Sequence, residues 1–277
     1  MDLTMTQDVT VDATSRVDVS DKGYLGGWKP GNPDARGLTL GNVFGPLNAG
    51  GGYGGYGWAA AGVTPIAYGD FKNPNELGSG GAGASGNPAF TGGTGGGLVR
   101  LKANRLTLNG AILANGETSS PGQLAGTYRT AGSGGGIKVE VAELLGTGKM
   151  EAMGDFYGGG GGRIAVLYGL NSGFNLGNLD ASNGFGAGVG TVFTKSAAQA
   201  DGELVLDNRN HSYGNPTTTP AILPTPIPAG SYDRLRIAGG AVAAATGPVT
   251  ATVLELAGGV VDFDAFSTPQ TSLTAVG

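Results

Sequence analysis

Hydrophobic and polar residues alternate in short stretches along most of the chain. The stretch 98–102 reads LVRLK. Because successive side chains of a β-strand point to opposite faces, Val99 and Leu101 share one face there, while Arg100 and Lys102 share the other. The same alternation occurs in the stretches 137–141, 164–168, 203–207 and 233–237. Stretches with the 3.6-residue period of a helix are nearly absent, so the pattern predicts an all-β chain.

A second apolar element follows each of the first three of these strands. Ile112, Met150 and Leu179 occupy matching places in the three elements, and each is followed two positions later by an alanine. The unit of strand plus second element recurs every ~27–38 residues, a period typical of solenoids, propellers and arrays. The three apolar positions are therefore expected to stack as one ladder.

Runs of glycine stand directly before the same three strands, at 93–97, 132–136 and 158–162. The chain has 57 glycines among its 277 residues. Inside a regular element glycine costs roughly 0.5–1 kcal/mol relative to alanine, because it loses more conformational freedom on folding. A chain that repeats this cost at matching points needs positive φ angles, or backbones closer together than a Cβ atom allows.

These patterns predict a parallel β-solenoid with long glycine-rich loops. Each repeat forms one rung, and the inward side chains of successive rungs stack as aliphatic ladders. A propeller blade needs four strands in ~40–45 residues, whereas the repeats here offer two or three. A β-sandwich is the competing fold, because the Asn-Gly pairs at 109–110, 115–116 and 183–184 are typical hairpin turns.

The pattern divides the chain into three parts. Residues 1–214 form the glycine-rich solenoid, with a glycine- and aromatic-rich insertion at 24–93. Residues 215–229 are rich in proline and threonine, which disfavours a central strand and favours an extended crossing. Residues 230–277 resume as a solenoid segment with shorter rungs. The first residues already alternate like a strand and the last have no cap, which predicts a piece of a longer protein.

Composition narrows the classes of partner. Only 13% of the residues are charged and the net charge is −5, which argues against a nucleic-acid partner or an anionic membrane. The chain has no cysteine, so disulfides and zinc–thiolate sites are excluded. No apolar stretch approaches the ~20 residues of a membrane-spanning helix.

One ordered series of motifs resembles a known family. VTVDATSRVDVSDKGYLGG is followed by GGLVRLKANRLTLNGAILANG, GGIKVEVAELLGTGKMEAMG, GGGGGRIAVLY and GAGVGTVFTK. The series, over roughly residues 8–265, resembles a glycine-rich module of very large bacterial secreted or surface proteins, which are adhesin-like or carry rearrangement-hot-spot (Rhs) repeats. The resemblance implies a non-catalytic, extracellular or cell-surface module. Its expected partners are neighbouring domains of the same large chain, and surface glycans or a cell surface.

The insertion contains both tryptophans of the chain. Aromatic rings on a glycine scaffold could stack on sugar rings, since each offers a large apolar face and a polar tip. The alternative is that they pack on one another, because glycine-rich segments have little else to bury. The candidate carbohydrate-binding residues are Trp28, Tyr53, Tyr56, Trp58 and Tyr68.

Two carboxylates provide the candidate metal site. Asp262 and Asp264 flank one residue, so both project from one face of a strand, a spacing that suits calcium or a catalytic carboxylate pair. The outward face of any exposed strand is also polar, so a solvated face is the competing interpretation. His211 is the only histidine and cannot build a multi-histidine metal site. No cofactor is expected, with calcium as the open alternative.

Two functions from different classes follow. The first is a non-catalytic structural or adhesive module, a stiff scaffold in a large secreted or cell-surface protein. The second is a carbohydrate-binding or polysaccharide-degrading β-helix module, a lyase or a hydrolase. The outward basic pairs, at 100 and 102 and at 234 and 236, form either an anionic-glycan patch or a solvated face.

Overall fold

The computed structural model describes residues 1–120, 130–184, 186–211, 223–262 and 273–275. The described chain is almost wholly β, with parallel sheets, as predicted. Its helical elements are two three-residue turns, Leu40–Asn42 and Leu176–Asn178. Among the described residues, no helix is long and apolar enough to cross a membrane.

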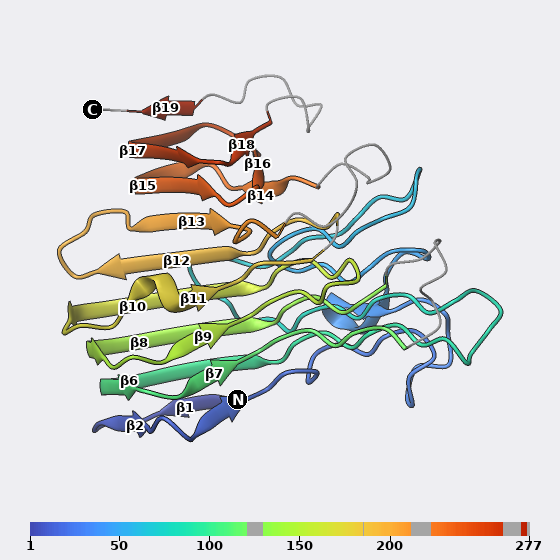
Figure 1. Cartoon of the computed structure of the whole chain (residues 1–277), viewed down its shortest axis with the longest axis horizontal. Helices are drawn as coiled ribbons and strands as arrows, with labels where there is room; N and C mark the ends of the chain where they lie inside the picture. Colours follow the sequence, from blue (N-terminus) through green and yellow to red (C-terminus); the bar gives the residue numbers. More distant parts are fainter. Residues whose placement is uncertain (121–129, 185, 212–222, 263–272, 276–277) are drawn as a thin grey trace.

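A ten-stranded sheet extends from β1 to β19 on one side of the molecule (Figure 1). Its strands stack in sequence order, and all pairings are parallel except the antiparallel pair β12–β13. Its members are β1 (Asp2–Thr4), β2 (Val9–Val11), β6 (Leu98–Leu108), β8 (Gly136–Leu145), β10 (Arg163–Asn171), β12 (Thr191–Ser196), β13 (Glu203–Asp207), β15 (Gly230–Ala238), β17 (Val249–Ala257) and β19 (Leu273–Ala275).

Two smaller parallel sheets accompany the large one. The first, sheet B, contains β3 (Arg16–Asp18), β7 (Ala111–Leu113), β9 (Lys149–Glu151) and β11 (Leu179–Asp180). The second, sheet E, contains β14 (Thr225–Ile227), β16 (Val242–Ala245) and β18 (Val260–Val261). A separate antiparallel pair joins β4 (Leu38–Thr39) to β5 (Val43–Phe44).

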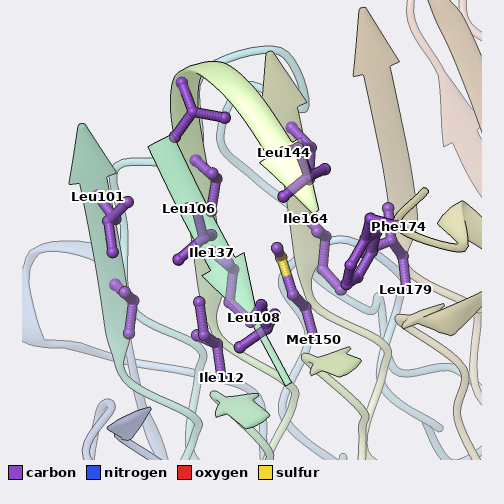
Figure 2. Packing of buried hydrophobic residues seen from close by; sticks show 14 of the residues in the cluster. Leu101, Leu106, Leu108, Ile112, Ile137, Leu144, Met150, Ile164, Phe174 and Leu179 are labelled. Carbon is purple, nitrogen blue, oxygen red and sulfur yellow. The ribbon is translucent and has the colours of Figure 1, made fainter. Parts of the chain in front are cut away.

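The first core lies between sheet B and the strands β6, β8 and β10 (Figure 2). Met150 is the register partner of both Ile112 and Leu179, which confirms the predicted ladder. In the large sheet, Ile137 pairs with Ile164 in the same way, and both side chains are fully buried. Each such side chain contributes roughly 1.5–3 kcal/mol of burial free energy, so the ladders are a major source of stability.

The core changes face at the antiparallel pair β12–β13. Val192 and its partner Val205 lie on the side of the first core, whereas the next pair, Phe193 and Leu204, lies in a second core. Side chains alternate between the faces of a strand, so the two cores lie on opposite faces of the large sheet. Sheet E belongs to the second core, through residues such as Ala243.

Part of the expected proline-rich crossing is a strand. Thr225–Ile227 forms β14 at the edge of sheet E, and Ile227 is buried in the second core. Proline is compatible with an edge strand because one side of its backbone needs no partner. Residues 215–222 of the expected crossing lie outside the described part, so the division of the chain at 214 and 230 stays a prediction.

The glycine-rich segments form a second packed body beside the strands, which we call the glycine bundle. In Figure 1 it lies to the right of the strands and includes the insertion, coloured blue to cyan. Its extended segments hydrogen-bond to one another through their backbones. They are the segments 23–27, 35–38, 50–58, 78–83, 92–97, 131–135, 158–162 and 187–190.

Consecutive amides of one bundle segment donate to different neighbours. The segment 78–83 does so in turn: positions 78 and 81 donate to segment 92–97, positions 80 and 83 to segment 35–38, and position 82 to Ala49. A repeat of three residues is that of a polyproline-II helix, whose backbone groups make no internal hydrogen bonds and point outward. Each segment can therefore be bonded from three directions at once.

Close approach of backbones explains the glycines of the bundle. A Cβ atom added at Gly81 would lie 1.9 Å from the carbonyl oxygen of Thr130, and one at Gly132 would lie 2.0 Å from that of Thr94. No such contact can be accommodated without moving a backbone. The corner at Gly240 uses glycine differently: an added Cβ would meet nothing within 4 Å, but φ is 82° there.

We predict that Gly81→Ala lowers the free energy of unfolding by about 3 kcal/mol or more, at the upper end of the cost of overpacking. The matched control is Gly45→Ala, where the added Cβ would meet its nearest contact, the Gly37 carbonyl oxygen, at 3.3 Å. That variant should change stability by less than ~1 kcal/mol. Chemical denaturation of both variants checks this, and equal effects would contradict the close-packed bundle.

Candidate functional site

The structure brings two of the five candidate aromatic residues together. The rings of Tyr53 and Tyr68 lie 5.0 Å apart, and Tyr53 is fully buried. The Tyr68 hydroxyl donates to the Leu77 carbonyl oxygen at 2.6 Å. Burial raises the pKa of both phenols well above the usual value. A ring without exposed surface has no face for a sugar, so Tyr53 takes part in packing.

Arg163 joins this pair to the start of β10. Its guanidinium is buried 5.4 Å from the centre of the Tyr53 ring and donates to the Tyr68 carbonyl oxygen at 2.7 Å. It also donates to the Thr191 hydroxyl at 3.2 Å. Desolvation lowers the pKa of Arg163 from its usual value. The residue therefore ties the insertion to the large sheet through carbonyl and hydroxyl oxygens.

The other three candidate aromatics are half-buried and lie elsewhere in the bundle. Trp28 has a positive φ of 61°, and its indole N–H donates to the Ala84 carbonyl oxygen at 2.8 Å. The indole nitrogen of Trp58 is buried without a hydrogen-bond partner. The backbone of Tyr56 accepts a hydrogen bond from the Gly188 amide at 2.7 Å. Whether these rings bind sugars stays a prediction.

The candidate metal site is described only in part. The Asp262 amide donates to the Ala243 carbonyl oxygen at 2.7 Å, while Asp264 lies outside the described residues. Within the described ranges, no group of three or more histidine, aspartate or glutamate side chains is arranged to hold a metal. His211 closes a turn through its amide, which donates to Asn208. The calcium prediction remains untested.

Three of the four residues in the predicted basic pairs have acidic or polar partners. Arg236 bonds to Asp207 at 3.2 Å and to Glu255 at 3.0 Å, so charges alternate across β13, β15 and β17. Arg234 likewise pairs with glutamates of the two neighbouring strands. On the other basic pair, the Arg100 guanidinium donates to an asparagine of the insertion. This compensation disfavours an anionic-glycan patch at 234–236.

A groove of about 630 Å³ crosses the outer face of sheet B. The inward positions of these strands form the core ladder, so their neighbours in sequence face outward. Small and polar side chains, together with Leu113, line the groove at corresponding places of successive strands and turns. They include Arg16, Asn109, Ala111, Thr147, Lys149, Asn178, Asp180 and Arg209. The alternation predicted an outward face, but nothing in its composition distinguished it from any exposed strand face.

Ion pairs, and a hydrogen bond from a backbone amide, orient several side chains of the groove. Lys149 contacts Glu151 at 2.6 Å and Arg209 contacts Asp180 at 3.6 Å. The Asn109 side chain accepts from the Thr147 amide at 3.2 Å. Asn109, Lys149 and Arg209 therefore have a partner within the protein and also line the groove.

A second cleft, of about 350 Å³, adjoins the groove where sheet B ends. Sheet B stops at β11, but the large sheet continues through β12 and β13, which leaves Val192 and Val205 as an apolar floor. Arg209 closes the open edge of β11. Its Nη2 donates to the carbonyl oxygens of Gly177 and Leu179, both at 2.7 Å. The guanidinium thus takes the place of a further strand, one way proteins protect sheet edges.

Comparison of the chain with protein-family models, with curated proteins and with solved structures finds no match.

We predict that stability falls as the pH rises above ~10, the usual pKa of an unfolded tyrosine. The pKa values of Tyr53, Tyr68 and Tyr232 are raised by burial, so the folded state holds protons that the unfolded state has lost. Tyr53→Phe should therefore flatten the alkaline decline, by up to roughly 1.4 kcal/mol per pH unit. Denaturation at a series of pH values measures it, and an unchanged decline would contradict the burial of this phenol.

We predict that Arg209→Gly increases self-association, because it uncovers the carbonyl group of Leu179 in β11 and that of Gly177 in the turn before it. Glycine suits the positive φ of 53° at this position, so backbone strain does not confuse the result. The charge-matched control is Arg105→Ala, whose side chain bonds to the carboxylates of Glu143 and Asp8. Size-exclusion chromatography with light scattering over a concentration series should show oligomers for the first variant alone.

Proposed function

We propose that the chain is a non-catalytic structural or adhesive module of a large secreted or cell-surface protein. In this proposal it forms a parallel β-solenoid whose rungs pass from the large sheet to the smaller sheets and return through the glycine bundle. It acts as a stiff scaffold that holds neighbouring domains of the same chain apart and displays a surface.

The observation that carries this proposal is the continuity between the glycine bundle and the strands. The segment 131–135 leads directly into β8, and the segment 158–162 leads directly into β10. The Gly134 amide donates to the Gly160 carbonyl oxygen at 3.0 Å, so the two rungs are bonded in the bundle as well as in the sheet. A body bonded in both parts resists bending and shear.

The charge arrangement supports the same role. Cross-strand pairs such as Arg105 with Glu143 fix neighbouring strands in register. Exposed pairs of this kind add only ~0–1 kcal/mol each, so their main effect is on alignment. Secretion and attachment to a large chain are suggested by the family resemblance alone.

A carbohydrate-binding role is the second candidate, and the groove on sheet B is the observation that favours it. Its volume lies within the ~300–1,000 Å³ of ligand pockets. A polysaccharide lyase or hydrolase would release new chain ends from a bound polymer. Incubation with polysaccharides and a reducing-end assay would separate binding from degradation.

We predict slow amide hydrogen exchange in the glycine segments 92–97 and 131–135, comparable with that of β6 and β8. Their amides are bonded and buried; for example, Gly96 donates to Ser133 at 2.8 Å. The exposed segment 85–89 provides the internal control and should exchange fast. Hydrogen exchange followed by mass spectrometry measures the rates of these segments. Fast exchange in the glycine segments would overturn the stiff-scaffold proposal.

A further inference from the structure

We propose that the groove on the outer face of sheet B binds a neutral polysaccharide chain that lies across its four strands. The proposal deepens the adhesive side of the function above, on which it rests, by naming a site and a ligand class. The aromatic residues of the insertion are not part of this site.

The spacing of the strands suits a polymer of sugars. The four strands of sheet B are stacked in register at ~4.8 Å, so they span ~14 Å. A pyranose unit is comparable in length to one such spacing, so successive sugars can meet equivalent positions of successive rungs. Ala111 lies at the centre of this face and leaves room for a ring to approach the backbone.

The polar groups of the groove suit hydroxyls, each of which donates and accepts hydrogen bonds. Lys149 and Arg16 provide donors, Glu151 provides acceptors, and the hydroxyl of Thr147 can do both. Lys149 already contacts Glu151 at 2.6 Å before a ligand arrives. This pair therefore loses less side-chain freedom on binding.

The balance of charge selects a neutral chain. Each of the three cations of the groove lies close to a carboxylate: Arg16 to Asp18 at 3.3 Å, Lys149 to Glu151 at 2.6 Å, and Arg209 to Asp180 at 3.6 Å. The net charge of these six groups is zero, so they create no field that would attract a polyanion. The adjoining cleft, with its floor of Val192 and Val205, can receive the apolar face of a terminal sugar.

The experiment uses the full chain and a panel of neutral hexasaccharides: cellohexaose, maltohexaose, mannohexaose and chitohexaose. Heparin and alginate serve as polyanionic comparators. Calorimetric titration should detect binding of at least one neutral hexasaccharide. Affinity should rise with chain length and level off at about four sugars, the number of strands in sheet B.

Two variants locate the site. Ala111→Phe fills the groove without removing a polar group, and Lys149→Ala removes a charged donor. Each should weaken binding about tenfold or more, since a hydrogen bond to a charged group is worth ~1.5–3 kcal/mol. The matched control, Lys102→Ala, lies on the large sheet and should leave affinity within a factor of two. If Ala111→Phe fails to fold, judged by its melting transition, Lys149→Ala and Arg16→Ala carry the test.

Three results would overturn the proposal: no binding to any neutral hexasaccharide, binding to the polyanions alone, or binding that survives the groove variants. None of these would affect hydrogen exchange in the glycine segments, so the scaffold proposal is tested separately.

Discussion

The absence of Cβ atoms is the constraint on which this structure depends. At Gly81, Gly93 and Gly132 a carbonyl oxygen of another segment occupies the place that a Cβ would need, at 1.9–2.0 Å. Removing the side chain lets backbones approach until their amides and carbonyls pair in three directions. The usual difficulty of buried backbone, unpaired polar groups, is thereby resolved without a sheet. Glycine is costly in conformational entropy, and the dense hydrogen bonding offsets that cost.

The stacked strands and the glycine bundle are stabilised by different interactions. The strands bury aliphatic ladders, whereas the bundle segments hydrogen-bond to one another through their backbones. Arg163 stands at the junction, where its guanidinium satisfies carbonyl groups of the insertion while β10 continues the ladder. The aromatic rings fill space that glycine leaves empty: Phe71 packs on Phe193 at 5.4 Å and so links the insertion to the second core.

The local elements could be predicted from sequence because they are encoded by side-chain period. Ile112, Met150 and Leu179 stack as their spacing suggests. The bundle could not be predicted in the same way, since glycine carries no pattern that tells which backbone lies next to it. The groove on sheet B escaped notice because outward polar residues look alike whether they bind or are solvated. The alternation of apolar and polar residues also gives no sign that the strand direction reverses between β12 and β13.

That reversal and the change of core face are linked by the hand of the connections between parallel strands. The hand of such a connection depends on three directions: that of the strands, that of progress along the sheet, and the side of the sheet on which the chain returns. Progress continues in sequence order from β1 to β19, while the strands turn round at β12–β13. Return on the same side would give the connections of the second half the opposite hand, whereas ~98% of parallel connections share one hand. Because direction and side change together at β12–β13, the described connection from β8 to β10 and that from β15 to β17 have the same hand.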